Sequence, residues 1–553
     1  MIGNNTRPVR AIVGFSVLTL LLAAATCAAP DAKPTAEIEP PPDASGGSGG
    51  VGGSGGESGA GGADVPDAPS EPIAGDPVWR DGYGEATNDQ KLFDIALDPA
   101  ANALVATIGY ITAIKIPGLN NDMPYISGSL DSPAPITVQN ILVFKQDAAT
   151  HMPTWAVPIR AGAEIVRSTV DVDPQGNVIV AGGFIGKVEI PDMPMAQSGL
   201  SNGSYDGYIA KLDPSGKPVW LRTFGAAGED YVTDVAVDGD GNIVVVGYST
   251  SATVDFGDGK PLTTIANKDI FVAKYDKDGN TKWAQRVGEA GATDIMGNHN
   301  WREPSATVEV SRADGSIFIG GIYRGALSFP PVGVPASAAE DGFIVKLDAD
   351  GVGKWHLEFG SANCKQRVRS VAIGPKGEVA LTGSFQGNVT IGDQTKVSFK
   401  GSQDLLIAML EPDGQPRWVR NYGSLGNQLG TKVLIDEKGR AFVGGSFTGS
   451  IDFFNGGTLT NTTKELPFTP TDIFVAKLKE DGTPLWAHAW GDTDPNGLVG
   501  IQTIEGGVFW KNDKNEPFVV FGGINSGSID FGGMVQFLKS AGFEDAYLMS
   551  ITY

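Results

Sequence analysis

Few residues of this chain have the types and spacing that catalysis requires. Its only histidines are His151, His299, His356 and His488. They form no HExxH zinc motif and no His-x-His pair, and no Gly-x-Ser-x-Gly stands in the strand–turn–helix context of a nucleophile elbow. The sequence therefore predicts no catalytic residues.

Acidic turns are the second group that could do chemistry, by binding calcium. Asp238-Gly-Asp240-Gly241 and Asp348-Ala-Asp350-Gly351 carry the Asp-x-Asp-Gly pattern of calcium loops. Neither is followed by the bidentate glutamate that completes an EF-hand loop. Hairpin turns explain both segments better, so we expect no cofactor and no metal site, although calcium remains an alternative.

Two segments combine aromatic rings with amides, acids and a base, which suits contact with a sugar or a peptide. The residues that we predict to bind a ligand are Asp294, His299, Asn300, Trp301, Arg302, Trp490 and Asp492. The alternative for Trp301 is that its ring only packs over a neighbouring structural unit.

A repeated sequence must position these residues. Its period is about 65 residues, which sets the architecture before local propensity is considered. The clearest copy reads KDIFVAKYDKDGNTKWAQRVG. Apolar residues alternate between Gly- and Asp-containing turns, which predicts four strands in each copy. In the third copy we place these strands at residues 231–238, 242–248 and 269–276, with the fourth around Trp283.

Counting the copies predicts how the fold closes. The outer-strand tryptophans are Trp79, Trp155, Trp220, Trp283, Trp355, Trp418 and Trp486, and the third strands begin at Asn140, Asp206, Asp269, Asp341, Asp404, Asp472 and Asp545. The tryptophan series begins one unit early, so residues 76–84 should complete the blade that residues 545–553 leave unfinished. We therefore expect an all-β, seven-bladed β-propeller of four-stranded blades. An open solenoid would instead need polar caps at its ends.

The N-terminal region has the features of a leader and a tether. Residues 1–26 combine Arg7 and Arg10 with an apolar run that would span about 22 Å as a helix, which is short for a membrane crossing. We interpret them as a signal peptide. The segment ending in Thr26-Cys27 resembles the lipobox of bacterial lipoproteins, which implies lipidation of Cys27; ordinary secretory cleavage after Ala25 is the alternative. Residues 27–75 continue as a linker rich in Pro, Gly and Ser, and residues 76–553 form the propeller.

Charge and cysteine content limit the partners. The chain has 41 basic and 64 acidic residues, a formal net charge of −23. This balance argues against nucleic acid and against electrostatic docking onto anionic lipid. Two cysteines offer no framework of disulfides, so the core must supply the stability. We expect a monomer that meets a membrane only through its lipid anchor.

The repeat resembles a known bacterial family. The pattern D-x-F-V-A-K-[LY]-D-x-x-G-x-x-x-W, with V-D-F-G in its later part, is similar to the SBBP-type β-propeller repeat over nearly all of residues 76–553. The best match covers residues 206–283, and the first blade departs from the pattern because no glycine precedes Trp155. The resemblance implies an exported, often surface-associated propeller and supplies no catalytic residues. The Asp213–Trp220 segment is also similar to the repeat of pyrroloquinoline-quinone dehydrogenases, in which it is structural.

These observations favour an exported, surface-tethered, non-enzymatic propeller that binds a protein or a polysaccharide. The connections from strand two to strand three, and from blade to blade, are long and should share one face, the long-loop face. We expect the cell envelope as its location, as an outer-membrane lipoprotein or at the cell surface, with secretion as the alternative. Two other functions remain open: an envelope enzyme at the channel mouth, either a glycan-active hydrolase or lyase or a quinone-type oxidoreductase, and a structural envelope protein.

Overall fold

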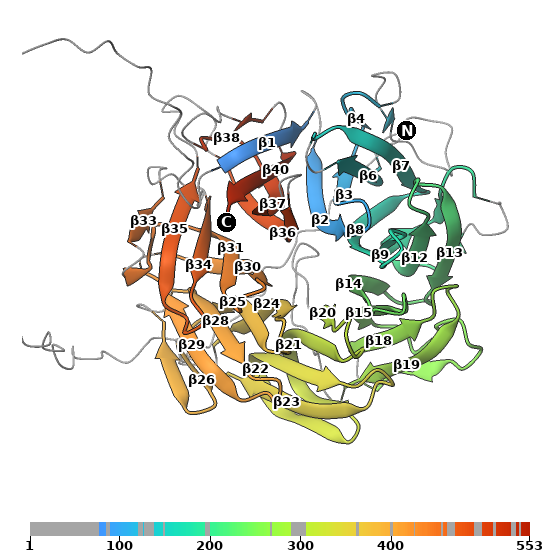
Figure 1. Cartoon of the computed structure of the whole chain (residues 1–553). Helices are drawn as coiled ribbons and strands as arrows, with labels where there is room; N and C mark the ends of the chain where they lie inside the picture. Colours follow the sequence, from blue (N-terminus) through green and yellow to red (C-terminus); the bar gives the residue numbers. More distant parts are fainter. Residues whose placement is uncertain are drawn as a thin grey trace, which may run out of the picture.

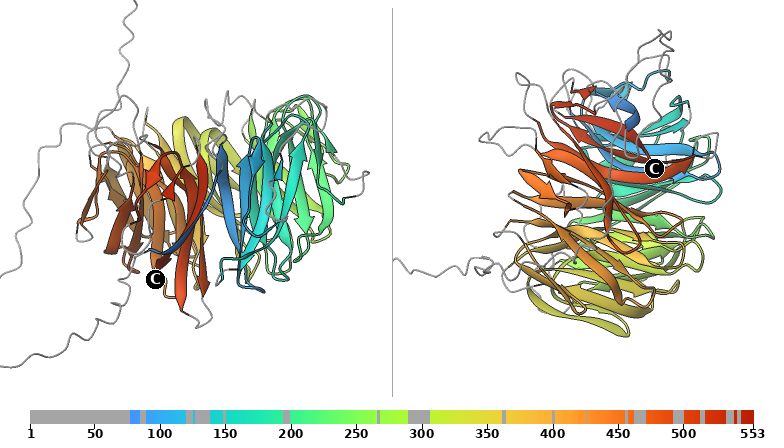
Figure 2. Two further views of the ribbon diagram at one scale, coloured as in Figure 1. Left: turned by 90° about the horizontal axis from the view of Figure 1, so that it is seen from above. Right: turned by 60° about the vertical axis from the view of Figure 1, so that its left-hand side comes forward.

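Seven antiparallel sheets stand in a ring around a common axis (Figure 1), as the repeat count predicted. The computed structural model describes residues 77–84, 89–119, 125–126, 138–147, 150–193, 199–265, 268–288, 306–360, 364–398, 402–424, 426–454, 457–461, 471–491, 500–511, 516–531, 538–540 and 544–553. Viewed from the side, the strands of the blades run between the two faces of a disc (Figure 2).

Each blade has four strands, ordered from the axis to the rim. The first strands are β2 (Gln90–Asp98), β8 (Glu164–Val172), β14 (Asp230–Val237), β20 (Ala306–Val310), β24 (Gln366–Ile373), β30 (Gln428–Ile435) and β36 (Gln502–Lys511). The second strands are β3 (Ala103–Tyr110), β9 (Val178–Ile185), β15 (Ile243–Ser249), β21 (Ile317–Phe329), β25 (Val379–Phe385), β31 (Ala441–Phe447) and β37 (Pro517–Asn525).

The outer half of each blade holds the repeated tryptophan and, in five blades, the repeated lysine. The third strands are β6 (Asn140–Asp147), β12 (Asp206–Leu212), β18 (Asp269–Tyr275), β22 (Val332–Leu347), β28 (Asp404–Leu410), β34 (Asp472–Leu478) and β40 (Asp545–Thr552). The fourth strands are β7 (Pro153–Ala161), β13 (Pro218–Phe224), β19 (Thr281–Val287), β23 (Gly353–Phe359), β29 (Pro416–Tyr422), β35 (Pro484–Trp490) and β1 (Pro77–Tyr83).

The two ends of the chain close the ring in one shared sheet. Strand β1 pairs antiparallel with β40, and Pro77 lies opposite Ile551 while Tyr83 lies opposite Ala546. The Tyr83 hydroxyl then donates to Gln146 Oε1 of the next blade at 2.5 Å. The predicted closure by the N-terminal and C-terminal strands is confirmed.

Short hairpins between the second and third strands were not predicted. They are β4–β5 (Ala113–Ile114, Tyr125–Ile126), β10–β11 (Lys187–Glu189, Gly199–Leu200), β16–β17 (Thr253–Val254, Leu262–Thr263), β26–β27 (Asn388–Ile391, Gln394–Val397), β32–β33 (Ser450–Asp452, Thr458–Thr460) and β38–β39 (Ser528–Ile529, Leu538–Lys539). In the remaining blade, β21 and β22 are longer than their counterparts, and their paired ends form the equivalent hairpin. We call these seven elements the rim hairpins.

An apolar pair anchors every rim hairpin in the core. The pairs, all buried, are Ile114 and Ile116, Val188 and Ile190, Val254 and Phe256, Leu327 and Phe329, Val389 and Ile391, Ile451 and Phe453, and Ile529 and Phe531. The hairpins lie along the periphery in Figure 1. At the tip of one, the Thr281 hydroxyl at the start of β19 donates to Phe256 O at 2.6 Å. The second-to-third connections are thus long because they cover the rim.

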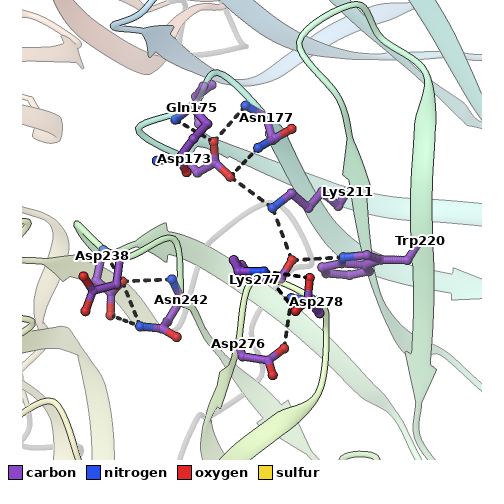
Figure 3. Close-up of polar contacts among 12 residues, drawn as sticks. Asp173, Gln175, Asn177, Lys211, Trp220, Asp238, Asn242, Asp276, Lys277 and Asp278 are labelled. Atoms are coloured by element: carbon purple, nitrogen blue, oxygen red, sulfur yellow. Dashed lines mark hydrogen bonds and ion pairs between the residues drawn. The ribbon is translucent and has the colours of Figure 1, made fainter.

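In each of three blades a buried lysine forms an ion pair within its own blade and donates a hydrogen bond to the next blade. Lys211 Nζ on β12 lies 3.0 Å from Asp173 Oδ2 and donates to Lys277 O of the following blade at 3.2 Å (Figure 3). Asp173 Oδ1 also accepts the backbone N–H of Asn177 at 2.8 Å. These additional bonds offset the cost of burying both charges. Equivalent pairs are Lys145 with Asp98 and Lys274 with Asp238.

The repeated tryptophan bonds to the same turn of the next blade. Trp220 Nε1 donates to Lys277 O at 3.3 Å (Figure 3). Gly279 of that turn packs against the indole ring, and a Cβ at this position would lie 3.1 Å from it. Five tryptophans share this bond, and the others are Trp155 to Pro214, Trp283 to Ala349, Trp355 to Pro412 and Trp418 to Glu480. The D-x-x-G-x-x-x-W motif therefore joins neighbouring blades, as expected for a structural motif. We call the tryptophan, the glycine against its ring and the turn carbonyl group the blade lock.

Two junctions lack the standard blade lock, and both involve the split blade. Trp79 on β1 meets His151 instead of a glycine; the ring centroids are 4.1 Å apart, and His151 has a left-handed backbone with φ of 57°. At the other junction, Tyr553 follows β40 in the place of that turn. Lys477 lies over the ring of the C-terminal residue Tyr553, with Nζ 4.2 Å from its centroid.

The blade lock predicts that glycines with similar backbones differ in importance. Gly414 has φ of 87°, and a Cβ there would lie 2.7 Å from the Trp355 ring, whereas Gly457 has φ of 90° and open space around it. We expect Gly457→Ala to lower the free energy of unfolding only by the cost of a left-handed backbone at alanine, about 1–2 kcal/mol. Gly414→Ala should lower the free energy of unfolding by a further amount of about 1–3 kcal/mol, because the Trp355 indole must move to make room for the Cβ. Urea unfolding of both variants measures the difference, and equal losses would contradict the lock.

Candidate functional site

Most of the sequence-predicted contacts lie outside the described residues. These are Asp294, His299, Asn300, Trp301, Arg302, Asp492 and the lipidation candidate Cys27. Their roles stay predictions. Within the described part of the chain, no helix is long and apolar enough to span a membrane.

Trp490 is the one predicted contact that the structure describes, and it is buried. It ends β35 with 6% of its surface exposed. Its ring centroid lies 6.0 Å from that of His488 and 6.2 Å from that of Phe531 in the next rim hairpin. Because the rim hairpin covers it, Trp490 is not the exposed aromatic contact that the sequence suggested.

The cavities along the axis bring together charged residues that sequence reasoning missed. One of about 370 Å³ opens at the end where β20 turns into β21 and is lined by Asp171, Glu309 and Arg312. A constriction of about 60 Å³ follows, with Asp94, Asp234 and Lys432 on its wall. A cavity of about 190 Å³ lies beyond it, beside Glu505. We call these three connected spaces the channel.

Two channel carboxylates hold neighbouring blades together. Asp94 Oδ2 on β2 accepts the Val170 N–H at 3.1 Å and the Thr169 hydroxyl at 2.9 Å, both on β8. Asp234 Oδ2 on β14 accepts the Val308 N–H on β20 at 2.9 Å. Backbone donors fix both carboxylates in place, which gives them a structural task. Burial raises the pKa of Asp94, and Lys432 partly opposes that effect.

Asp171 has the same task nearer the channel mouth. Its Oδ2 accepts the Val237 N–H of the next blade at 2.7 Å, and its Oδ1 lies 3.3 Å from Arg312 Nη2. Burial raises the pKa of Asp171 to about 6, while Arg312 and the backbone bonds act in the opposite direction. The acid is therefore predominantly ionised at neutral pH.

Lys432 and Glu309 are two channel residues for which the described part of the chain shows no such bond between blades. Burial acts to lower the pKa of Lys432, but the carboxylates around it, Asp94 first, outweigh burial and raise that pKa. Burial and the nearby Asp171 raise the pKa of Glu309 to about 8, so its carboxyl group carries a proton at neutral pH. An ammonium group and a neutral carboxyl group both donate hydrogen bonds to a ligand in the channel.

The channel offers no evident metal or catalytic centre. Among the described residues, no group of three or more His, Cys, Asp or Glu side chains is arranged to hold a metal ion. The Asp-x-Asp-Gly segments form hairpin turns: Asp238 Oδ1 accepts the Asn242 N–H at 2.8 Å, and Asp348 Oδ1 accepts the Val352 N–H at 2.9 Å. Calcium binding elsewhere in the chain stays untested.

A signal in the repeats could have found the channel residues. Asp94, Asp234, Ser370 and Lys432 each follow a β-bulge in the first strand of their blade. The bulge turns this position toward the axis. The residue after the bulge is Arg167 in another blade and Gly506 in a further one, so comparing the copies column by column would have shown that this position varies between acid, hydroxyl, cation and glycine.

Comparison with known proteins identifies similar proteins without a shared function. No family model matches the chain. An uncharacterized WD repeat-containing protein, L264, of Acanthamoeba polyphaga mimivirus is 23% identical over 71% of this chain and 32% of that protein. The regulatory protein FlaEY of Caulobacter vibrioides is 22% identical over 59% of this chain and 33% of that protein. The chain thus spans about a third of the length of these curated relatives.

Solved structures with a related shape have mixed functions. Sqt1 from Chaetomium thermophilum matches with a TM-score of 0.38 and 11% identity, over 87% of this chain and 99% of that chain. A europium-containing methanol dehydrogenase matches with a TM-score of 0.37 and 10% identity, over 86% and 93%. TM-scores this low support no conclusion about the function of this chain. The chain is a seven-bladed β-propeller with a WD-repeat protein among its relatives.

The channel makes a prediction about pH and stability. The pKa of Glu309 is about 8 in the folded protein, whereas an unfolded glutamate has a pKa of about 4.3. As pH rises between these values, the unfolded state loses the proton first, so the folded state loses stability relative to it. Glu309→Gln removes this penalty. We expect the variant to be about 1–2 kcal/mol more stable than the parent near pH 8.5, after allowing for water in the channel, and equal to it near pH 4.

Urea unfolding at the two pH values measures this difference. Glu437→Gln is the matched control, because the Glu437 side chain is 82% exposed. A Glu309→Gln effect that does not change with pH, or that the control reproduces, would contradict the raised pKa.

Proposed function

We propose that this protein is an exported, surface-tethered propeller that binds a protein or a polysaccharide and catalyses no reaction. The observation that carries the proposal is the use of the channel acids. Asp94, Asp171 and Asp234 accept backbone N–H groups of neighbouring blades. A carboxylate committed in this way is a poor general acid or base, because moving a proton onto it breaks the bonds that hold the blades together.

The proposed binding surface is the long-loop face. Blade-to-blade connections emerge there, and the segment containing Trp301 and Arg302 belongs to one of them. The second-to-third connections contribute less than their length suggests, since the rim hairpins bring them back along the periphery. The blade-to-blade connections are therefore the principal candidates for ligand contact.

The proposed location follows from the N-terminal sequence. Residues 1–26 direct export, lipidated Cys27 anchors the mature chain, and the linker up to residue 75 holds the propeller away from the bilayer. The resemblance to SBBP-type repeats supports a surface location. On this proposal the protein belongs to the cell envelope, as an outer-membrane lipoprotein.

A second function, an enzyme acting at the channel mouth, is favoured by one observation. Lys432 and protonated Glu309 donate toward the same space, and the cavity of about 370 Å³ beside them opens to solvent. Such a pair could hold a small polar substrate. We rank this function lower because the acids beside the pair are committed to backbone N–H groups of neighbouring blades.

Binding and turnover experiments separate the two functions. We expect Trp301→Ala and Arg302→Ala to weaken capture of surface proteins or envelope polysaccharide by at least tenfold, since each removes a contact side chain. Glu309→Gln with Lys432→Met should leave capture unchanged. The measurement is quantitative pull-down with purified protein. Turnover of a small substrate that the channel variants abolish, with no captured partner, would establish the enzyme instead.

The lipid anchor has its own test. We expect mass spectrometry of the mature protein to find a diacylated or triacylated N-terminal cysteine, and Cys27→Ser to move the protein from the membrane fraction to the soluble fraction. Globomycin should block maturation of the parent but not of the variant. An unmodified mature chain that begins at Thr26 would exclude the anchor.

A further inference from the structure

Phe454 is the most exposed aromatic ring in the described part of the chain, and its backbone is unusual. It follows β32 at the tip of a rim hairpin, with 73% of its surface exposed and φ of 54°. Left-handed backbone costs a residue other than glycine about 1–2 kcal/mol. A bulky side chain in this conformation is an outlier.

Among the described residues, two other rim hairpins place glycine at the corresponding position, and three place proline. Gly257 and Gly392 follow the buried apolar pairs of their hairpins, with φ of 104° and 61°. The sequence Ile451-Asp-Phe453-Phe454 thus has a phenyl ring where Val254-Asp-Phe256-Gly257 has none. Strained residues that display a side chain tend to occur at functional sites. The strained backbone at Phe454 does not serve to bury its ring, so packing does not explain why a phenyl ring stands there.

A groove lies beside this ring, between two neighbouring blades. Its volume is about 280 Å³, and its walls are formed by Lys396, Arg420, Asn421, Tyr422, Phe454 and Thr483 together with Pro484. Tyr422 forms the floor and is buried, with its hydroxyl donating to Gly482 O at 3.1 Å. We call this space the rim groove. It is near the lower limit of about 300 Å³ that is usual for small-molecule pockets.

Two cations, Lys396 and Arg420, face the rim groove. The acid beside Arg420 is Asp481, whose pKa is held below its usual value by Thr483 first and by Arg420 to a smaller extent. Arg420 donates to Val419 O at 3.0 Å and to Asp481 O at 2.7 Å, which holds the guanidinium group in place while using two of its N–H donors. A guanidinium group has five such donors, so others remain for a ligand. Burial, together with the charge of Arg420, lowers the pKa of Lys396. An anion between the two cations would relieve their repulsion.

We propose that the rim groove binds an acidic sugar unit of a polysaccharide. The apolar face of a pyranose ring stacks on Phe454, and the sugar carboxylate lies between Lys396 and Arg420. A planar guanidinium group suits carboxylate recognition, and the exposed ring supplies a surface that is rigid before the ligand arrives. Ring hydroxyls face Asn421 and Thr483. The rim groove lies on the periphery, away from the long-loop face, so each of these two sites can fail without the other.

Titration calorimetry of the full chain with trigalacturonate tests the proposal. We expect the parent to bind trigalacturonate and to bind its methyl ester at least tenfold more weakly, because the ester lacks the negative charge. Phe454→Gly and Arg420→Met should each weaken binding of trigalacturonate at least tenfold. Leu200→Ala is the matched control, because Leu200 lies on another rim hairpin and is 71% exposed; its binding should equal that of the parent.

Thermal unfolding separates loss of the site from loss of the fold. Phe454→Gly relieves the left-handed strain, so we expect its melting temperature to equal or exceed that of the parent. Lost binding in a variant that is at least as stable supports the rim groove. The proposal is overturned if the parent does not bind trigalacturonate, if the ester binds equally well, or if Phe454→Gly binds like the parent.

Discussion

The contact between neighbouring blades depends on a backbone carbonyl group in the turn between the third and fourth strands. Lys277 O, for example, accepts a hydrogen bond from Lys211 and another from Trp220, both on the preceding blade. The turn can reach these donors only because Gly279 lies flat on the indole ring. A blade therefore folds against the turn of its neighbour, and no blade has a complete set of partners by itself. The repeat is conspicuous in the sequence because five of the seven junctions use the same tryptophan and glycine for this interaction.

A similar arrangement near the axis accounts for the carboxylates in the channel. First-strand carboxylates reach across three of the gaps between blades to backbone N–H groups, as Asp234 does to Val308. The charge in the channel thus arises from joining blades. Lys432 compensates for part of it, and Glu309 avoids adding to it by keeping its proton. Most of the acidic side chains in the channel thus have a structural role. The residues that distinguish one blade from another are single positions at which the repeat is broken.

The sequence was sufficient to predict the number of blades, the strand order and the closure by β1 and β40, because those depend on spacing that recurs. It was not sufficient for features that depend on one copy. The burial of Trp490 results from Phe531, which lies in the next blade, and periodicity along one strand cannot reveal such a contact. The rim hairpins were hidden because their strands are too short to alternate recognisably. The V-D-F-G segment was recognised as part of the repeat, but its buried pair was not recognised as the anchor of a hairpin.

The pairing of Pro77 with Ile551 also imposes an order of events on folding. A chain that emerges N-terminus first, from a ribosome or a translocation pore, exposes β1 long before β40 exists. Strand β1 must then remain without its partner while the complete blades between them assemble. The interval is a period of vulnerability, because an unpaired strand can join another chain. The interval ends when β40 has been made and pairs with β1. Removal of β40 would leave the ring unsealed.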